Sequence, residues 1–302
     1  MAVIENRREL AKIIKKPRIK RPRQREAWQK FSQNRFAVLG ILIIAFLAFL
    51  ALFAPLIAPH EPLEQKPVRR LEAPSFEYPF GTDDLGRCIF SRIVYGTRYS
   101  LGIGLIVVAL TSSAGTLLGL LAGYIGGLFD ETVMRGVDII LAFPNIIPAL
   151  VLAGLLGSGV SSVVLALVLT QWPTYTRLVR GEVLSLKKRA FVEATRALRA
   201  SDIYIIRKHI LPNCLGNVIV LGTLEIAHVI IFAAALSFLG LGIQLPNPEW
   251  GAMLKAGISF FLSAPHLSLF PGFMIMLTVM AFNFVGDGLR DCLDVDTEVT
   301  RA

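Results

Sequence analysis

The chain has few charged residues and few cysteines for its length. Only 18% of its 302 residues are charged, 54% are hydrophobic, and the mean hydropathy is +0.61. A soluble domain needs more polar residues than this to wet its surface, so lipid is the expected solvent. The three cysteines, Cys88, Cys214 and Cys292, form no CxxC pair and have no histidine cluster beside them. Neither a zinc site nor a disulfide framework is therefore indicated.

Motifs of several enzyme classes are also missing. The sequence has no GxxxxGK[ST] loop to cradle nucleotide phosphates, so the chain is not expected to hydrolyse ATP itself. It has neither HExxH nor GxSxG, which argues against an intramembrane enzyme. The first 35 residues are too long and too charged for a signal peptide, and the apolar run after them can stay as an anchor. We expect a chain that is not an enzyme and binds no cofactor or metal itself.

Six apolar runs approach the roughly 20 helical residues that a bilayer core requires. They are Ala37 to Ile57, Leu101 to Leu121, Ile139 to Leu156, Val160 to Thr176, Asn217 to Leu239 and Leu267 to Val285. The fourth is short, carries Gln171 and Pro173, and needs extension toward Leu178. A further stretch, Gly251 to Ser263, is short and contains Lys255, so it is expected to be a surface or re-entrant helix. The predicted fold is an all-α membrane protein with six transmembrane helices.

Basic residues are spread unevenly among the loops. Twelve Lys and Arg precede the first run and nine lie between Arg177 and Lys208, whereas residues 59–97 hold five against six acids. Lys and Arg gather on the cytoplasmic side of short loops, so both termini are expected there. Nucleic acid is not an expected partner, because the charge forms no stripe on a polar fold. Around Trp28 and Phe31 the arm fits either a helix on the inner leaflet or a disordered basic tail.

These runs and charges divide the chain into five expected parts. They are a basic cytoplasmic arm (1–35), a first transmembrane helix (36–58), an extracytoplasmic segment (59–97), a core membrane domain (98–290) with a cytoplasmic loop at 190–213, and a cytoplasmic tail (291–302).

Small residues recur every four positions in the second run. They are Thr111, Gly115, Gly119, Gly123 and Gly127. Such a ladder lets a neighbouring helix approach the backbone closely, so we interpret it as a packing surface. Pro144 and Pro148 in the third run and Pro173 in the fourth remove backbone donors, which predicts kinked helices shielded from lipid.

Ionisable residues also enter the membrane region. Glu225 and His228 lie three residues apart on the fifth run, hence on one helix face, and such groups are costly at membrane depth. With Asn145 and Asn283 they could line a translocation pathway; the alternative is a mutually satisfied pair at a helix interface. The spans offer too few further ligands for a metal site.

The cytoplasmic loop from Ala190 to Asn213 contains apolar residues at helical spacing. Two sets stand out: Phe191, Ala194 and Leu198, then Ile203, Ile206 and Ile210. Two short amphipathic helices are expected, with Ser201 or Asp202 as N-cap of the second and Pro212 ending it before the next span. Their apolar face should pack against the inner leaflet or a protein groove.

Four stretches resemble a known family. EATRALRASDIYIIRKHILP is similar to the EAA loop of importer-type ABC permeases. FGTDDLGRCIFSRIVYGTRYSL (Phe80 to Leu101), ALSFLGLGIQLPNPEWGAML (Ala235 to Leu254) and LFPGFMIMLTVMAFNFVGDGLRDCLD (Leu269 to Asp294) resemble the C-type subunit of the dipeptide/oligopeptide/nickel permease family. The resemblance runs from about Gln29 to Asp294, with the motifs in the family's order.

The resemblance implies the type I ABC importer permease fold, in a multi-pass subunit of a bacterial or archaeal cytoplasmic membrane. The implied partners are a second homologous permease, two ABC ATPases that carry ATP and Mg²⁺, and an extracytoplasmic substrate-binding protein. The residues implied to couple the permease to the ATPases are Glu193, Ala194, Thr195, Leu198, Arg199, Ser201 and Asp202. Arg199 stands where the family usually has glycine, so the first helix is expected to run on without a sharp break.

The leading hypothesis is therefore a permease subunit of an ATP-driven importer for di- or oligopeptides or a related small solute. Within the family, nickel or an oligosaccharide is the alternative cargo. A different class is an ion-coupled secondary transporter, which would carry its own coupling-ion site and often an internal repeat. Dependence of transport on partner ATPases separates the two classes.

Overall fold

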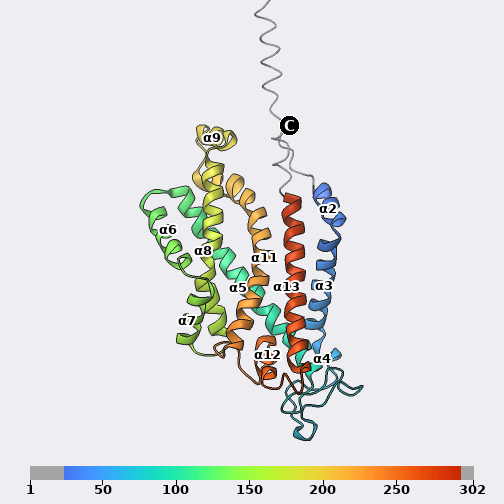
Figure 1. The fold of residues 1–302 in the computed structure, drawn as a ribbon. Coiled ribbons are helices and arrows are strands. Elements are labelled where there is room, and N and C mark those ends of the chain that lie inside the picture. Colours follow the sequence, from blue (N-terminus) through green and yellow to red (C-terminus); the bar gives the residue numbers. More distant parts are fainter. Residues whose placement is uncertain (1–23, 294–302) are drawn as a thin grey trace, which may run out of the picture.

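The computed structural model describes residues 24–293, and every regular element in that range is helical (Figure 1). The elements are α2 (Gln24–Gln33), α3 (Arg35–Leu52), α4 (Ala54–Ile57), the 3-10 turn η1 (Pro67–Arg69), α5 (Ile89–Ile125), α6 (Gly127–Leu141), α7 (Ile146–Leu156), α8 (Val160–Lys187), α9 (Ala190–Ala197), α10 (Asp202–Ile205), the π-helix η2 (Ile206–Ile210), α11 (Leu211–Phe238), α12 (Trp250–Ile258) and α13 (His266–Leu293). The expectations for arm residues 1–23, the Trp28 side chain and tail residues 294–302 lie outside the described residues.

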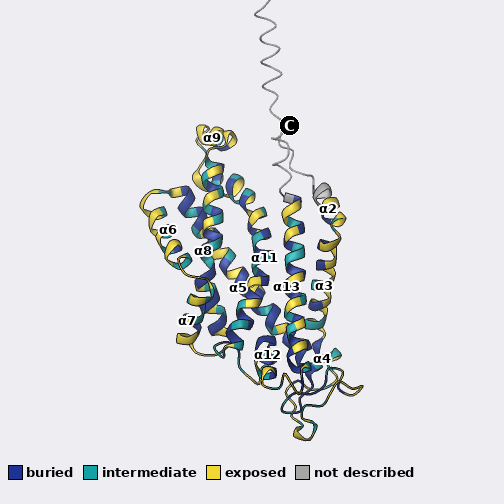
Figure 2. Cartoon of the chain, viewed as in Figure 1, coloured by how far each residue is buried: buried dark blue, intermediate teal, exposed yellow. Residues whose placement is uncertain are grey.

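The outer surface of the helices is apolar. On α3, the side chains of Phe36, Leu42, Phe46 and Phe49 are 50 to 64% exposed, and Figure 2 shows exposed residues along the outside of the bundle. Among residues 24–293, four helices are long and apolar enough to cross a membrane: α3, α5, the stretch Asp202–Phe238, and α13. The bent pair α6 and α7 adds a fifth if it is counted as one span. Large apolar side chains exposed on this scale are typical of a surface that faces lipid.

The third apolar run is not a single helix, which corrects the prediction for Ile139 to Leu156. The end of α6 and the whole of α7 meet at a bend of 90°. Pro144 lies in the break, where it lacks an N–H and disfavours helical geometry in the residue before it. Pro148 falls in the first turn of α7, where its missing N–H has no partner to lose.

The fourth run is longer than predicted. Helix α8 extends past Thr176 and Leu178 to Lys187, with Pro173 inside it. Its 28 residues correspond to a length of roughly 42 Å. Its second half contains polar and basic residues, so α8 is not apolar enough to count as a membrane span by composition alone.

Helix α8 packs along the small-residue ladder of α5. A Cβ on Gly115 would lie 2.6 Å from Cβ of Tyr175, and one on Gly119 would lie 2.6 Å from the carbonyl oxygen of Thr176. A Cβ on Gly123 would lie 2.9 Å from Cβ of Val183. Gly127 is different: it follows the end of α5, has φ +60° and would meet nothing within 4 Å. The close approach of the two helices therefore depends on three glycines of the predicted four.

Pro212 does not end a separate helix, which corrects a second prediction. Residues 202–238 form one continuous helical stretch in which α10 passes through η2 into α11. The π-turn Ile206–Ile210 immediately precedes Pro212. A π-turn widens the helix and leaves room for the ring of Pro212. It also shifts the backbone hydrogen bonds, so the N–H that proline lacks is not required at position 212.

The two ends of the bundle carry different parts of the chain (Figure 1). Helix α2, helix α9 and the C-terminal end of α13 lie at one end. The irregular segment between α4 and α5 lies at the other, together with α12. Helix α3 packs on α13, where a Cβ on Gly40 would lie 2.7 Å from the carbonyl oxygen of Ala281.

Candidate functional site

Helix α9 and the turn after it project beyond the bundle and contain the residues assigned to coupling (Figure 1). Glu193 lies in the first turn of α9, followed by Ala194 and Thr195. Leu198 is the C-cap. Ser201 is the N-cap of the next helix, since its hydroxyl oxygen accepts from the N–H of Tyr204 at 3.3 Å. The prediction that Ser201 or Asp202 caps this helix is confirmed for Ser201.

The turn at Arg199 is sharp, so the expectation that the first helix runs on is wrong. The Arg199 N–H donates to the carbonyl of Arg196 at 2.9 Å, and the Ala200 N–H donates to that of Thr195 at 3.4 Å. These two bonds form a Schellman motif, which requires a left-handed residue just beyond the C-cap. Arg199 adopts that conformation with φ +58°. The turn therefore forms although arginine occupies a position that favours glycine.

Several apolar side chains of this projecting segment are uncovered. Phe191 is 42% exposed, Leu198 84%, Ile203 69% and Tyr204 50%. Val192, Ile205 and Ile210 point inward and are fully buried. The predicted apolar set is therefore split, because Ile210 belongs to the buried start of the long helix while Phe191 and Leu198 face outward. An exposed apolar surface at the tip of a projecting helix is typical of a protein docking site.

Tyr124, at the end of α5, connects this segment to the bundle. Its hydroxyl donates to Oδ1 of Asp202 at 2.5 Å, and the guanidinium of Arg196 lies 6.0 Å from its ring centroid. Nζ of Lys187 lies 5.4 Å from the same centroid and donates to the Tyr124 carbonyl at 2.8 Å. These contacts connect α5 to α9 and to the turn after it, so a movement of α9 would displace Tyr124 and the end of α5. Sequence reasoning missed Tyr124, because 78 residues separate it from Asp202.

The four residues assigned to a pathway do not form one cluster. Nδ1 of His228 lies 3.5 Å from Oε1 of Glu225, so these two side chains are adjacent as predicted from their spacing. Asn145 is exposed at the break between α6 and α7, and Asn283 is half-buried on α13. Within residues 24–293, neither asparagine has a contact with Glu225 or His228 that would extend the pair.

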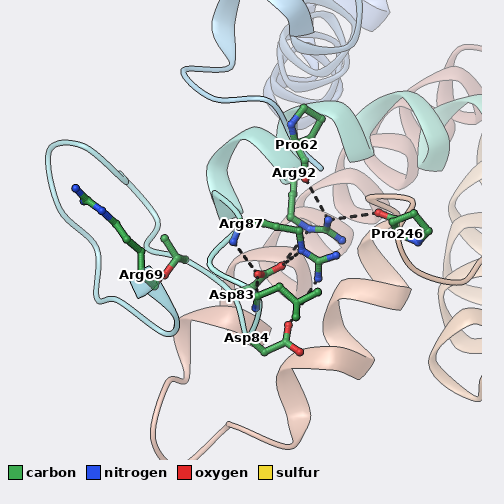
Figure 3. A network of polar contacts seen from close by, with 9 residues as sticks. Pro62, Arg69, Asp83, Asp84, Arg87, Arg92 and Pro246 are labelled. Carbon is green, nitrogen blue, oxygen red and sulfur yellow. Dashed lines mark hydrogen bonds and ion pairs between the residues drawn. The ribbon is translucent and has the colours of Figure 1, made fainter. Parts of the chain in front are cut away.

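A buried charge network occupies the opposite end of the molecule (Figure 3). Oδ2 of Asp83 accepts from Nε of Arg87 at 2.6 Å and lies 3.6 Å from Nε of Arg92. Both guanidiniums are almost completely buried. Arg92 also donates to the carbonyls of Pro62 at 3.2 Å and Pro246 at 3.3 Å. One carboxylate thus holds two cations that join three segments of the chain.

Helix α12 is fixed to the same end. Glu249 is its N-cap and accepts from the N–H groups of Gly251 at 2.9 Å and Ala252 at 2.8 Å. Burial raises the pKa of the Glu249 carboxyl, an effect that these two bonds oppose. Nε1 of Trp250 donates to the carbonyl of Ile93 on α5 at 3.2 Å. Sequence reasoning missed this whole assembly, although Asp83 and Arg87 lie in one of the stretches that resembles the permease family.

The described residues contain no group of three or more His, Cys, Asp or Glu side chains placed to hold a metal ion. Polar ties lie at the two ends of the molecule, and further pairs lie between them, such as Arg180 with Asp130 of α6 and Glu225 with His228 on α11.

Residues 115–298 match the family described as binding-protein-dependent transport system inner membrane component. Residues 23–74 match the N-terminal TM domain of oligopeptide transport permease C. Among curated proteins, the chain is 46% identical over 270 residues to the dipeptide transport system permease protein DppC of Alkalihalophilus pseudofirmus, covering 89% of each. It is 44% identical over 271 residues to the glutathione transport system permease protein GsiD of Pectobacterium atrosepticum, covering 89% of this chain and 90% of that one.

Solved structures share the fold at low sequence identity. An inward-facing structure of the MetNI methionine ABC transporter aligns with a TM-score of 0.53 at 19% identity, over 68% of this chain and 97% of that one. An amino acid ABC transporter crystallised with histidines aligns with a TM-score of 0.51 at 13% identity, over 66% and 92%.

Proposed function

The chain belongs to the family of binding-protein-dependent transport system inner membrane components, as a multi-pass C-type permease subunit and not an enzyme, and from this premise we propose its specific role. It forms half of the membrane pathway of an ATP-driven importer for di- or oligopeptides. The observation that carries this proposal is the projecting α9 segment with its uncovered apolar side chains. A permease without a nucleotide-binding loop needs an exposed surface on which an ATPase can dock, so that conformational changes of the ATPase reach the membrane helices.

The proposed partners are a second homologous permease, two ABC ATPases and an extracytoplasmic binding protein. In this arrangement Glu193, Ala194, Thr195 and Leu198 meet a groove of one ATPase. ATP-driven closure of the ATPase pair pulls on α9, and the Tyr124 to Asp202 contact passes the movement to α5. ATP and Mg²⁺ stay on the partner subunits.

The proposed topology has six crossings with both termini in the cytoplasm. Helices α3, α5, α8, α11 and α13 each cross once, and α6 with α7 forms one broken crossing. The five-part division predicted from the sequence is retained, with α9 in the cytoplasmic loop at 190–213. The basic residues of that loop support this sidedness, because cytoplasmic loops are enriched in Lys and Arg.

Small peptides are the proposed cargo. The curated relatives described above are named for dipeptide and glutathione transport, and both of those compounds carry a peptide bond and a free amino group. Specificity is expected to reside mainly in the binding protein.

Purified complex in proteoliposomes tests this function. ATPase stimulation and uptake are measured with binding protein loaded with a dipeptide, an oligosaccharide or nickel. The proposal expects stimulation and ATP-dependent uptake with the dipeptide. If only nickel or only the oligosaccharide stimulated the ATPases, that compound and not a peptide would be the cargo. Uptake in the absence of the ATPases would reject ATP-driven import and indicate a secondary transporter.

Glu193→Arg tests the coupling surface. We expect loss of ATPase binding and of transport, because the change adds a like charge beside Arg189 and Arg196 at the docking surface. Copurification of the ATPases measures it. Glu61→Arg makes the same change on an exposed residue at the opposite end and should leave the ATPases bound. Normal copurification and transport by Glu193→Arg would contradict the coupling assignment.

A further inference from the structure

Glu225 and His228 lie on a face of α11 that this chain leaves partly open. The Glu225 side chain is 13% exposed and that of His228 is 58% exposed. Both belong to a helical stretch apolar enough to span a membrane. An ionisable side chain at that depth does not face lipid, because lipid cannot solvate its charge. This face must therefore meet water or another protein surface.

Tyr175 of α8 lies behind this pair. Its side chain is fully buried, and its hydroxyl completes no hydrogen bond of normal geometry. The hydroxyl oxygen is 3.7 Å from where a Cβ on Gly222 would lie, one turn before Glu225 on α11. Gly222 and Glu225 are three residues apart and share one face of α11, and the side chain of Thr111 on α5 lies next to the Tyr175 phenol. An unpartnered polar atom in a buried position is rare and calls for an explanation.

The glycine ladder explains why Tyr175 is held there. Cβ of Tyr175 packs where Gly115 has no side chain, at 2.6 Å from the position a Cβ would take. A larger residue at position 115 would push the ring outward. The packing of α8 on α5 therefore positions the Tyr175 hydroxyl between α5 and α11, near the face of α11 that carries Glu225.

A second acid continues the polar line along the contact between α8 and α11. Asn217 donates to Oε1 of Glu182, and the buried thiol of Cys214 also lies against the Glu182 carboxylate. Asn217 precedes Glu225 by eight residues, a distance of about 12 Å along a helix toward the end that carries α9. Two carboxylates thus follow one another between the same two helices.

We propose that Glu225, His228 and Tyr175 form a binding site for the amino-terminal ammonium group of a peptide in transit. The inference rests on the proposed function, since it assumes that the cargo is a peptide. An ammonium group offers three N–H donors, a carboxylate and a phenol oxygen offer acceptors, and the His228 imidazole lies 3.5 Å from the Glu225 carboxylate, where it orients that group. The carboxylate also supplies the opposite charge, and Glu182 provides the next acidic position toward the α9 end.

The test measures peptide binding directly, without the binding protein. Saturation-transfer NMR is recorded with dialanine and with N-acetyl-dialanine on the nucleotide-free complex of all membrane and ATPase subunits in nanodiscs. Wild type should bind dialanine and give only background with the acetylated form. Glu225→Gln should weaken dialanine binding by about tenfold or more, because glutamine keeps an acceptor oxygen but loses the negative charge that strengthens the bond to an ammonium group. Glu131→Gln, at an exposed site on α6, should bind like wild type.

Tyr175→Phe is the second variant, since it removes one oxygen without changing charge or ring packing. We expect it to weaken dialanine binding by about threefold. Copurification of both variants with the ATPases shows that the complex still assembles. If Glu225→Gln does not assemble, Tyr175→Phe becomes the deciding variant. A dialanine affinity equal to that of wild type in Tyr175→Phe would overturn the proposed site.

The outcomes separate the site from the proposed function. ATP-dependent dipeptide uptake by wild type, with equal dialanine binding by wild type and Glu225→Gln, would overturn the site and leave the function standing. Equal binding of free and acetylated dialanine by wild type would likewise overturn it. Absence of dipeptide uptake by wild type would reject the function itself, and the site with it.

Discussion

Arg199 carries a backbone conformation that L-residues rarely adopt. Its φ of +58° brings Cβ close to the following carbonyl, which costs roughly 1–2 kcal/mol relative to the right-handed region. Glycine has no such penalty. The hydrogen bonds of the Schellman motif hold Arg199 there, so this turn stores strain at the surface proposed for ATPase docking.

Replacing Arg199 by glycine should therefore stabilise the turn. We expect a gain of about 1 kcal/mol, seen as roughly fivefold slower hydrogen exchange of the α9 amides in the purified complex. Ala197→Gly is the matched control, because residue 197 is helical and the same residue type there should speed exchange by a similar factor. Faster exchange in Arg199→Gly would show that arginine is not strained at this position.

Asp83 is a second residue whose replacement is expected to change the stability of the protein. It is the central carboxylate for two buried guanidiniums, whereas Asp84 forms a longer ion pair with Arg87, at 3.6 Å. Asp83→Ala should lower the free energy of unfolding by about 3–5 kcal/mol, because it leaves buried cations without their counterion. Glu77→Ala removes an exposed ion pair with Arg69 and should cost less than about 1 kcal/mol. Thermal unfolding of the purified permease compares them, and equal shifts in melting temperature would contradict the difference.

At the scale of elements, the contact between α5 and α8 organises the core. Gly115, Gly119 and Gly123 let the α8 backbone approach, which seats Tyr175 against α11 and brings Lys187 to the end of α5. The carbonyls of Gly123 and Tyr124 have no helical partner at that end, and Nζ of Lys187 supplies one. The same contact thus positions both the proposed ammonium site and the base of the α9 segment.

Gly119→Val should disrupt this contact. The new Cβ would lie 2.6 Å from the Thr176 carbonyl oxygen and 2.9 Å from Cβ of Val179, so the helices must separate. We expect a loss of about 1–3 kcal/mol or more, measured as a lower melting temperature of the complex. Gly102→Val places the same side chain on α5 where a Cβ has nothing within 4 Å, and it should change the melting temperature little. Similar losses in both variants would mean that the ladder is not a packing surface.

At the scale of the whole molecule, the two ends differ in what they expose. Leu198 projects near α9 and is 84% exposed, and Phe76 projects in the segment between α4 and α5 with its side chain fully exposed. The native cysteines are all buried, with exposures of 5% or less, so an introduced cysteine reports on its own position. This makes the proposed sidedness measurable.

Cysteine labelling tests the topology. In cells that express the permease without its ATPases, a membrane-impermeant maleimide should label Phe76→Cys from outside and leave Leu198→Cys unlabelled. In inverted membrane vesicles the pattern should reverse. Labelling of both positions from the same side would contradict the proposed six crossings and the cytoplasmic location of α9.

The sequence by itself determined the properties that depend on neighbouring residues. Apolar runs located the membrane helices, basic residues favoured a sidedness, and the loop motif located the α9 segment, because hydropathy, charge and helical spacing are local. Ser201 as an N-cap and the adjacency of Glu225 and His228 follow from the same short range. A kink at Pro144 was predicted, but not a bend of 90°, and Pro212 was wrongly predicted to end a helix, because the cost of a proline depends on the turn around it.

Only the tertiary structure decided which distant groups meet. Tyr124 contacts Asp202 across 78 residues, and Arg92 reaches the Pro246 carbonyl across 154. Tyr175 reaches the surroundings of Glu225 only because glycines on α5 let α8 approach. Arg199 takes the left-handed conformation because hydrogen bonds of the folded turn require it. Each of these depends on the relative placement of whole helices, which no local pattern of residue types encodes.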